Sequence, residues 1–298
     1  MKKLSFCFVI MAGLLWGTSG LFVQVLAPYG FTTLQISAVR GGVSFLAVAL
    51  FALIFDRSIF RITPRELLLC VSIGVSLFAT GNCYFYSLQI TSISTAVVLM
   101  YTAPALVMLF SVLFLGEKLT PLKAVSLGLM LGGCVFVSGV IGDFKVNTLG
   151  LLLGLLSGIA FAAYNILTKI GIEKGSRPIS VTLYAFLFAS FLSFVLSKPM
   201  GIFQSAAKAP GETVPLLIGL GLVSFVVPYV LYAMAMKHLP AGTVSALGIV
   251  EPMAATLYGA IFLKEPKTVY DFLGIFLVLL AVLLFGFAES PALQRKKQ

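Results

Sequence analysis

Ten stretches of mostly apolar residues follow one another along the chain, separated by short polar loops. A helix needs about 20 apolar residues to cross the hydrocarbon core of a bilayer. Charged residues make up only 10% of the 298 residues and hydrophobic residues 60%, which excludes a soluble enzyme, a nucleic-acid-binding protein and a disordered chain. The sequence therefore predicts an all-α membrane protein with ten transmembrane helices, at residues 4–26, 34–55, 67–88, 93–115, 121–141, 149–170, 178–197, 214–236, 242–263 and 268–288.

Threonines mark the expected starts of three of these helices. Thr63 and Thr120 are each followed by a proline, and Thr268 is not. A threonine side chain caps the free amides of a first helical turn, and proline is tolerated there because its missing N–H has no partner in any case.

The basic residues predict the orientation of the chain. With an even number of spans both termini share one side of the membrane. Fourteen of the 20 basic residues would lie on that side, five on the other, and Arg40 within a span. Basic loops favour the cytoplasm, so both termini are expected to be cytoplasmic. The fourteen are Lys2, Lys3, Arg57, Arg61, Arg65, Lys118, Lys123, Lys169, Lys174, Arg177, Lys237, Arg295, Lys296 and Lys297; the five are Lys145, Lys198, Lys208, Lys264 and Lys267.

The chain also matches itself after a shift of 148 residues. A second match, at a shift of 141 residues, places Gly13–Gly17 on Gly154–Gly158. We interpret the chain as two five-helix units, residues 1–145 and 146–298. The matches at the shift of 148 are Val75 with Val223, Ser76 with Ser224, Tyr84 with Tyr232, Thr95 with Thr243, Pro104 with Pro252, Phe114–Leu115 with Phe262–Leu263, Glu117 with Glu265 and Thr120 with Thr268.

An odd number of spans in each unit has a consequence for topology. The second unit must enter the membrane in the opposite sense to the first, which gives inverted repeats. Many secondary transporters have this architecture, with a binding site near the membrane midplane between the halves and alternating access to it. The repeat thus predicts a transporter.

Short motifs in both halves resemble those of EamA-type members of the drug/metabolite transporter superfamily. They are Tyr84–Leu88, Tyr101–Pro104 and Leu115–Thr120 in the first half, and Tyr232–Met236, Val250–Pro252 and Leu263–Pro266 in the second. Arg40 and Trp16–Gly17 are similar to family positions too, whereas Pro266 departs from the family's glycine-glutamate motif. The resemblance covers essentially the whole chain. It implies a ten-helix carrier, often an exporter of amino acids or other small metabolites, in some members with proton coupling.

Two ionisable side chains fall well inside spans, Arg40 and Glu251. A charge at membrane depth costs several kcal/mol unless it faces a cavity or a partner. Two interpretations stand side by side: a structural ion pair between the two residues, or a substrate site in which Glu251 also couples transport to protons.

Two prolines, Pro104 and Pro252, occupy matching positions in the fourth and ninth spans. Each frees a carbonyl four residues earlier, at Met100 and Gly248. Irregular backbone at membrane depth is tolerated mainly where it lines a cavity or is buried in protein. The prolines therefore predict a pair of hinges, with a packing kink as the alternative.

Aromatic and amide side chains inside spans indicate a polar-aromatic pocket for an amphipathic metabolite. For the tyrosines, a place in the interfacial belt is the alternative. The candidate binding residues beside Arg40 and Glu251 are Trp16, Asn82, Tyr84, Tyr101, Tyr164, Asn165, Tyr229 and Tyr232.

We accordingly expect a secondary carrier that moves an amino acid or a similar solute across the plasma membrane by alternating access, with export as the direction. Gly17–Gly20 also fits the short GxSG pattern of intramembrane serine proteases, with Ser19 as the nucleophile, and a non-transporting assembly subunit is a further alternative. No ATP-binding or dinucleotide motif occurs, and the four cysteines have no metal-ligand spacing. No cofactor, metal or nucleic-acid partner is therefore expected.

Overall fold

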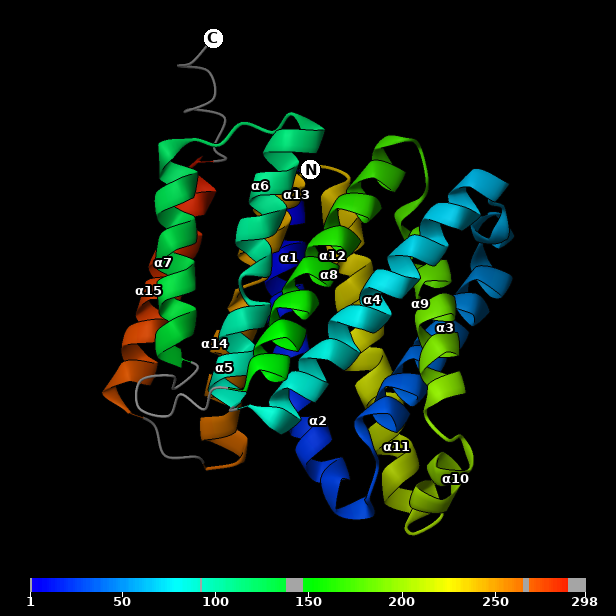
Figure 1. The fold of residues 1–298 in the computed structure, drawn as a ribbon. Coiled ribbons are helices and arrows are strands. Elements are labelled where there is room, and N and C mark those ends of the chain that lie inside the picture. Colours follow the sequence, from blue (N-terminus) through cyan, green and yellow to red (C-terminus); the bar gives the residue numbers. More distant parts are fainter. Residues whose placement is uncertain (1, 92, 138–146, 265–267, 289–298) are drawn as a thin grey trace.

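The computed structural model describes residues 2–91, 93–137, 147–264 and 268–288 (Figure 1), and within them every regular element is a helix. The elements are α1 (Lys2–Gly17), α2 (Ser19–Leu26), η1 (Ala27–Tyr29), α3 (Thr33–Phe55), η2 (Arg57–Phe60), α4 (Pro64–Ile90), α5 (Ile93–Met100), α6 (Ala103–Leu115), α7 (Pro121–Val137), α8 (Thr148–Glu173), α9 (Pro178–Leu196), α10 (Met200–Ala206), α11 (Pro210–Gly221), η3 (Leu222–Val226), α12 (Val227–Met236), α13 (Ala241–Leu247), α14 (Val250–Phe262) and α15 (Val269–Ala288).

Nine helical segments of the described chain are long and apolar enough to cross a membrane. Many of their large apolar side chains face outward; Ile54 and Phe55, for example, are each 72% exposed. Such surfaces suit a lipid environment, and the chain is an all-helical, multi-pass membrane protein. The fifth expected span, 121–141, is described only as far as Val137, so the count of ten stays a prediction.

The three predicted helix starts are confirmed. The Thr63 hydroxyl accepts a hydrogen bond from the Glu66 amide, and the Glu66 carboxylate accepts one from the Thr63 amide, which is a capping box. The Thr120 hydroxyl accepts a hydrogen bond from the Lys123 amide. Thr268 and Asp271 cap one another in the same reciprocal way at the start of α15.

The short helix α10 was not expected. It occupies part of the segment between the seventh and eighth predicted spans, and α11 begins at Pro210 rather than near residue 214. Proline at the first helical position explains the earlier start.

Three of the predicted spans are broken rather than continuous. The first is interrupted at Thr18, between α1 and α2, the fourth at Tyr101 and Thr102, and the ninth at Gly248 and Ile249. In the fourth and ninth spans a proline lies in the first turn of the helix that follows the break, Pro104 in α6 or Pro252 in α14, and it cannot donate a backbone hydrogen bond to the preceding turn. At the fourth-span break the Thr102 hydroxyl donates to the Leu99 carbonyl, at 2.7 Å. The expectation that Pro252 leaves the Gly248 carbonyl free is wrong, because this carbonyl accepts a hydrogen bond from the Glu251 amide at 3.0 Å.

Glycines of the opposite half pack against these two breaks. A Cβ atom added to Gly17 of α1 would lie 3.1 Å from the Glu251 carbonyl oxygen, and one on Gly158 of α8 would lie 3.1 Å from the Leu99 carbonyl oxygen. Only glycine allows two backbones to approach so closely. The irregular backbone at each break is thus buried in protein rather than in lipid.

The arrangement of the helices brings the two halves of the chain into contact throughout (Figure 1). Helix α1 packs against α12 and α14, α8 against α4 and α5, and α3 against α9. Helices α7 and α15 form a pair along one side of the bundle. Helix α1 begins and helix α15 ends at the same end of the bundle.

Candidate binding site

A cavity of about 520 Å³ lies between the two halves of the chain. Its walls come from α1, α2, α3, α4, α5, the α5–α6 break, α8, η3, α12, α14 and the start of α15. The sequence-predicted residues that line it are Trp16, Arg40, Tyr84, Tyr101, Tyr229, Glu251 and Pro252.

The cavity extends toward one end of the bundle. Gln24, near the end of α2, and Asp271, at the start of α15, belong to its lining, and Gln24 is exposed. We call this the open end. The opposite end, where α1 begins and α15 ends, is the closed end, and no residue of α6 or α13 lines the cavity there among the described residues.

Arg40 of α3 lies close to two aromatic rings. The centre of its guanidinium lies 4.6 Å from the Phe225 ring centroid and 5.5 Å from the Phe85 centroid. Gly81 allows the close approach, since a Cβ there would lie 2.9 Å from an Arg40 nitrogen. The buried Nε atom has no hydrogen-bond partner, so the surrounding protein does not satisfy every donor of this cation.

Glu251 lies in the first turn of α14, immediately after the break in the ninth span. The positive end of a helix dipole favours a carboxylate there. No ion pair joins Glu251 to Arg40 within the part of the chain that the structure describes. Arg40 and Glu251 therefore do not form the structural ion pair that was one of the two interpretations. They line the same cavity without a direct bond between them.

Aromatic rings form one wall of the cavity. The Trp16 ring lies 5.0 Å from the rings of both Tyr229 and Tyr232, and Tyr164 meets Tyr229 edge-on at 5.7 Å. Such edge-on and tilted contacts hold large side chains in fixed orientations. The tyrosines belong to the core of the bundle rather than to an interfacial belt, because Tyr101, Tyr164, Tyr229 and Tyr232 are all buried.

Four of the sequence-predicted binding residues lie outside the cavity lining. The Tyr232 hydroxyl donates to Asn165 Oδ1 at 2.6 Å, and Asn165 Nδ2 donates to the Phe161 carbonyl. The Tyr232 ring packs against Trp16 and the Tyr164 ring packs against Phe161, so these tyrosines support two residues that line the cavity. Asn82 donates to the Phe78 carbonyl of its own helix. Their positions favour a supporting role over direct contact with a ligand.

The predicted hinge residues take different positions. Pro252 lines the main cavity, whereas Pro104 lines a small space of about 10 Å³ beside it, together with Tyr101, Ser245 and Gly248. Each proline lies in the first turn of the helix after a break, and their role as hinges stays a prediction.

Sequence reasoning missed Phe85 and Phe225, the two rings near the Arg40 guanidinium. Nothing in the hydrophobic pattern sets them apart from the other 24 phenylalanines of the 26 in the chain. The repeat did contain a signal for one of them, because Phe225 and Leu77 are related by the shift of 148 residues and both line the cavity.

The alternative nucleophile Ser19 also lines the cavity. The sole histidine, His238, follows α12 at the closed end, whereas Ser19 begins α2, beyond the whole of α1. A nucleophile needs a base within hydrogen-bond reach, and this histidine does not supply one. Within the described ranges, no group of three or more His, Cys, Asp or Glu residues could hold a metal ion.

Several residues that the sequence singled out lie outside the described part of the chain, namely Lys145, Glu265, Pro266, Lys267, Arg295, Lys296 and Lys297.

Comparison with known proteins gives consistent matches along the chain. The model of the EamA-like transporter family matches twice, at residues 3–139 and 148–287. An uncharacterized transporter of Archaeoglobus fulgidus is 30% identical over 93% of this chain and 94% of its own length. The threonine/homoserine exporter RhtA of Escherichia coli K12 is 28% identical over 87% of this chain and 83% of its own. One crystal structure, at 20% identity, has the same fold with a TM-score of 0.80 over 96% of this chain and 99% of the other.

Proposed function

Because the chain belongs to the EamA-like transporter family, we propose that it is a secondary carrier that exports an amino acid or a similar small amphipathic solute by alternating access. In this proposal ten helices cross the plasma membrane as two inverted repeats, residues 1–145 and 146–298, with both termini in the cytoplasm. Arg40 and Glu251 set the charge of the central site, the aromatic residues set its shape, and Pro104 and Pro252 serve as hinges.

The observation that carries the proposal is the pair of opposite charges in one cavity. Arg40 retains an unpartnered buried donor, and Glu251 has no ion-pair partner among the described residues. A zwitterion can neutralise both at once, with its carboxylate at Arg40 and its ammonium group at Glu251. The apolar side chain of such a solute would meet Trp16 and Phe161. Charges buried at membrane depth and facing a cavity mark substrate or ion pathways.

Support for the inverted repeats comes from the glycines at the helix breaks. Gly13 and Gly17 of the first half pack against the ninth-span break, and Gly154 and Gly158 of the second half pack against the fourth span. These glycine pairs are the ones that the shift of 141 residues relates. Each half thus holds the broken helix of the other, as a duplicated carrier with a shared central site requires.

The proposal is tested in proteoliposomes with radiolabelled amino acids, beginning with threonine and homoserine because the relative RhtA is named an exporter of these two. We expect saturable counterflow of at least one amino acid and its loss in Arg40→Gln. The matched control is Lys174→Gln, which removes an exposed positive charge at the end of α8 and should transport normally. Absence of counterflow for every amino acid and amine tested would contradict the proposal and favour a non-transporting assembly subunit.

Proton coupling is tested separately through Glu251. We expect Glu251→Gln to abolish the pH dependence of transport, because the amide cannot exchange a proton. An unchanged pH dependence in that variant would reject this role while leaving transport itself in place. The protease alternative is tested by Ser19→Ala, and only the loss of a measured proteolytic activity would support it.

A further inference from the structure

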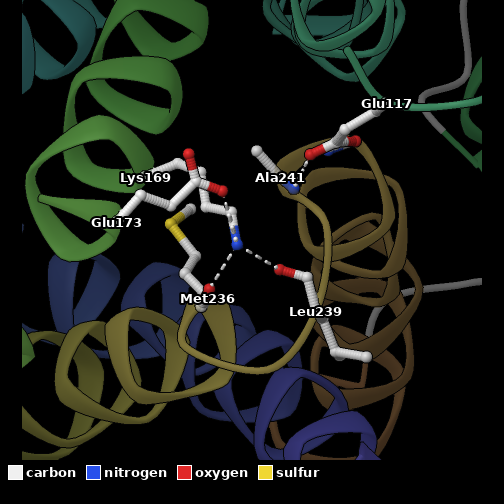
Figure 2. A network of polar contacts seen from close by, with 7 residues as sticks. Glu117, Lys169, Glu173, Met236, Leu239 and Ala241 are labelled. Carbon is white, nitrogen blue, oxygen red and sulfur yellow. Dashed lines mark hydrogen bonds and ion pairs between the residues drawn. The ribbon is translucent and has the colours of Figure 1, made fainter. Parts of the chain in front are cut away.

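At the closed end, two charged side chains form hydrogen bonds with the backbone of the segment from the end of α12 to the start of α13 (Figure 2). Both oxygens of Glu117, in the loop after α6, accept hydrogen bonds from the first amides of α13: Oε1 from Ala241 at 2.6 Å and Oε2 from Gly242 at 3.2 Å. Lys169 of α8 donates to the carbonyl of Met236 at 2.8 Å and to that of Leu239 at 3.1 Å. Glu173, one turn further along α8, lies 3.4 Å from the Lys169 ammonium.

Each charge has the sign that its helix end favours. A carboxylate at the amino end of α13 and an ammonium at the carboxyl end of α12 both oppose the local helix dipole charge. Lys169 is buried, and burial raises the pKa of the Glu117 carboxyl while its two amide partners act in the opposite direction. Charge-assisted bonds in such a setting are stronger than neutral ones, and removing one partner leaves the other buried and unsatisfied.

The segment that Glu117 and Lys169 hold leads through α13 directly to the candidate site. Helix α13 has only seven residues and ends at the break that precedes Glu251. It packs tightly against α6, since a Cβ on Gly242 would lie 2.8 Å from the Met108 sulfur. Val107 of α6 is fully buried in a cluster with Ala241 and with Ile166 of α8. A path from the cavity to the closed end therefore requires α13 to separate from α6 and α8.

We propose that Glu117 and Lys169 form a latch that holds the closed end shut while the cavity is open at the other end. The latch rests on the proposed alternating access, and it assigns a positioning role to two residues that do not line the cavity. Glu117 comes from the first half of the chain, whereas the loop that it holds belongs to the second half. Breaking the hydrogen bonds between Glu117 and the first amides of α13 would therefore let the two halves separate at the closed end.

The test measures solvent access to each end without any transported solute. In a chain whose four native cysteines are replaced by serine or alanine, a single thiol is introduced by Val107→Cys to report on the closed end. In a second chain, Ser19→Cys reports on the cavity. The rate of labelling by a membrane-impermeant maleimide is measured on purified protein in detergent, where both ends are reachable. Glu117→Gln and Lys169→Met are the latch variants; Lys118→Gln and Lys174→Met are matched controls with exposed side chains on the same segments.

We expect each latch variant to raise the labelling rate at position 107 by about tenfold, because losing a hydrogen bond to a charged group shifts an equilibrium by about that factor, and to lower the rate at position 19. The controls should change neither rate. An unchanged rate at position 107 overturns the latch. A rise at both positions also overturns it, because that result indicates a loosened bundle rather than a shifted equilibrium. Since no substrate is needed, reciprocal rates without counterflow would reject the transported solute class and not the latch.

Discussion

Gly17 of α1 lies directly against the backbone of Glu251 in α14, the carboxylate residue of the cavity. A Cβ atom added to Gly17 would lie 2.8 Å from the Ala254 Cβ, 2.9 Å from the Ala255 nitrogen and 3.1 Å from the Glu251 oxygen. Two of these atoms are backbone, so no side-chain rotation can relieve the contact. The depth and direction of Glu251 therefore depend on a residue of the other half of the chain that has no side chain.

Gly17→Ala should push α1 away from α14. We expect a loss of about 1–3 kcal/mol of stability, typical of an overpacked contact, and a loss of transport from displacement of Glu251. Thermal unfolding of the purified protein and counterflow measure the two effects. Gly20→Ala is the control, because a Cβ there meets nothing within 4 Å. Equal melting temperatures and equal counterflow in the two variants would show that the contact of Gly17 with α14 is unimportant.

Tyr232→Phe should weaken the support behind Trp16. The change removes the hydroxyl that donates to Asn165 and leaves a buried oxygen unsatisfied. We expect a loss of about 1 kcal/mol, as for hydrogen bonds between membrane helices, measured by thermal unfolding. In a double-mutant cycle with Asn165→Leu the two losses should be less than additive. The control Tyr86→Phe changes an exposed tyrosine and should leave the melting temperature unchanged.

Phe225→Leu should reduce affinity for the transported solute while keeping the bundle folded. The ring that lies 4.6 Å from the Arg40 guanidinium is replaced by an apolar side chain that offers no cation–π contact. We expect KM to rise about fivefold, corresponding to about 1 kcal/mol, with a smaller change in kcat. Phe191→Leu, at an exposed position of α9, is the control. A fall in kcat at constant KM would instead assign Phe225 to the conformational change.

The link between Asp56 and Arg177 should give a pH-dependent contribution to stability. Arg177 donates to Asp56 at 2.5 Å, and this hydrogen bond lowers the pKa of Asp56 from 3.8 to about 2. Because the folded protein favours the ionised carboxylate, its contribution is present above pH 3.8 and is lost as the pH falls toward about 2. Asp56→Asn should therefore lower the melting temperature slightly at pH 7, by an amount limited by solvent exposure.

The difference in melting temperature between Asp56→Asn and the wild-type chain should disappear as the pH falls toward about 2, where the Asp56 carboxyl is protonated. Adding Arg177→Gln to Asp56→Asn should lower the melting temperature little further if the two residues act as a pair. A constant difference across the pH range would mean that the carboxylate stabilises the fold by some other contact.

Individual residues show which features could be predicted from the sequence and which required the structure. Thr63, Thr120 and Thr268 cap helices as predicted, because capping is a local interaction between residues three positions apart. Pro104 and Pro252 each lie within a turn of a helix break, because a missing amide acts on its own helix; whether they act as hinges stays a prediction. In contrast, Asn165 and Tyr232 were expected to contact the solute, but they bond to each other behind the aromatic wall. Polarity inside a span indicates that a partner is needed and does not identify the partner.

Sequence by itself thus determined the all-helical membrane architecture, the family motifs, the helix ends and the two unusual charges, Arg40 and Glu251. These follow from local chemistry and from the length of an apolar segment relative to a bilayer. Only the tertiary structure decided that the two charges line one cavity without pairing, that Phe85 and Phe225 hold Arg40, and that Glu117 and Lys169 grip the loop before α13. Each of these relationships joins residues far apart in the chain, and the packing of helices against one another alone brings them together.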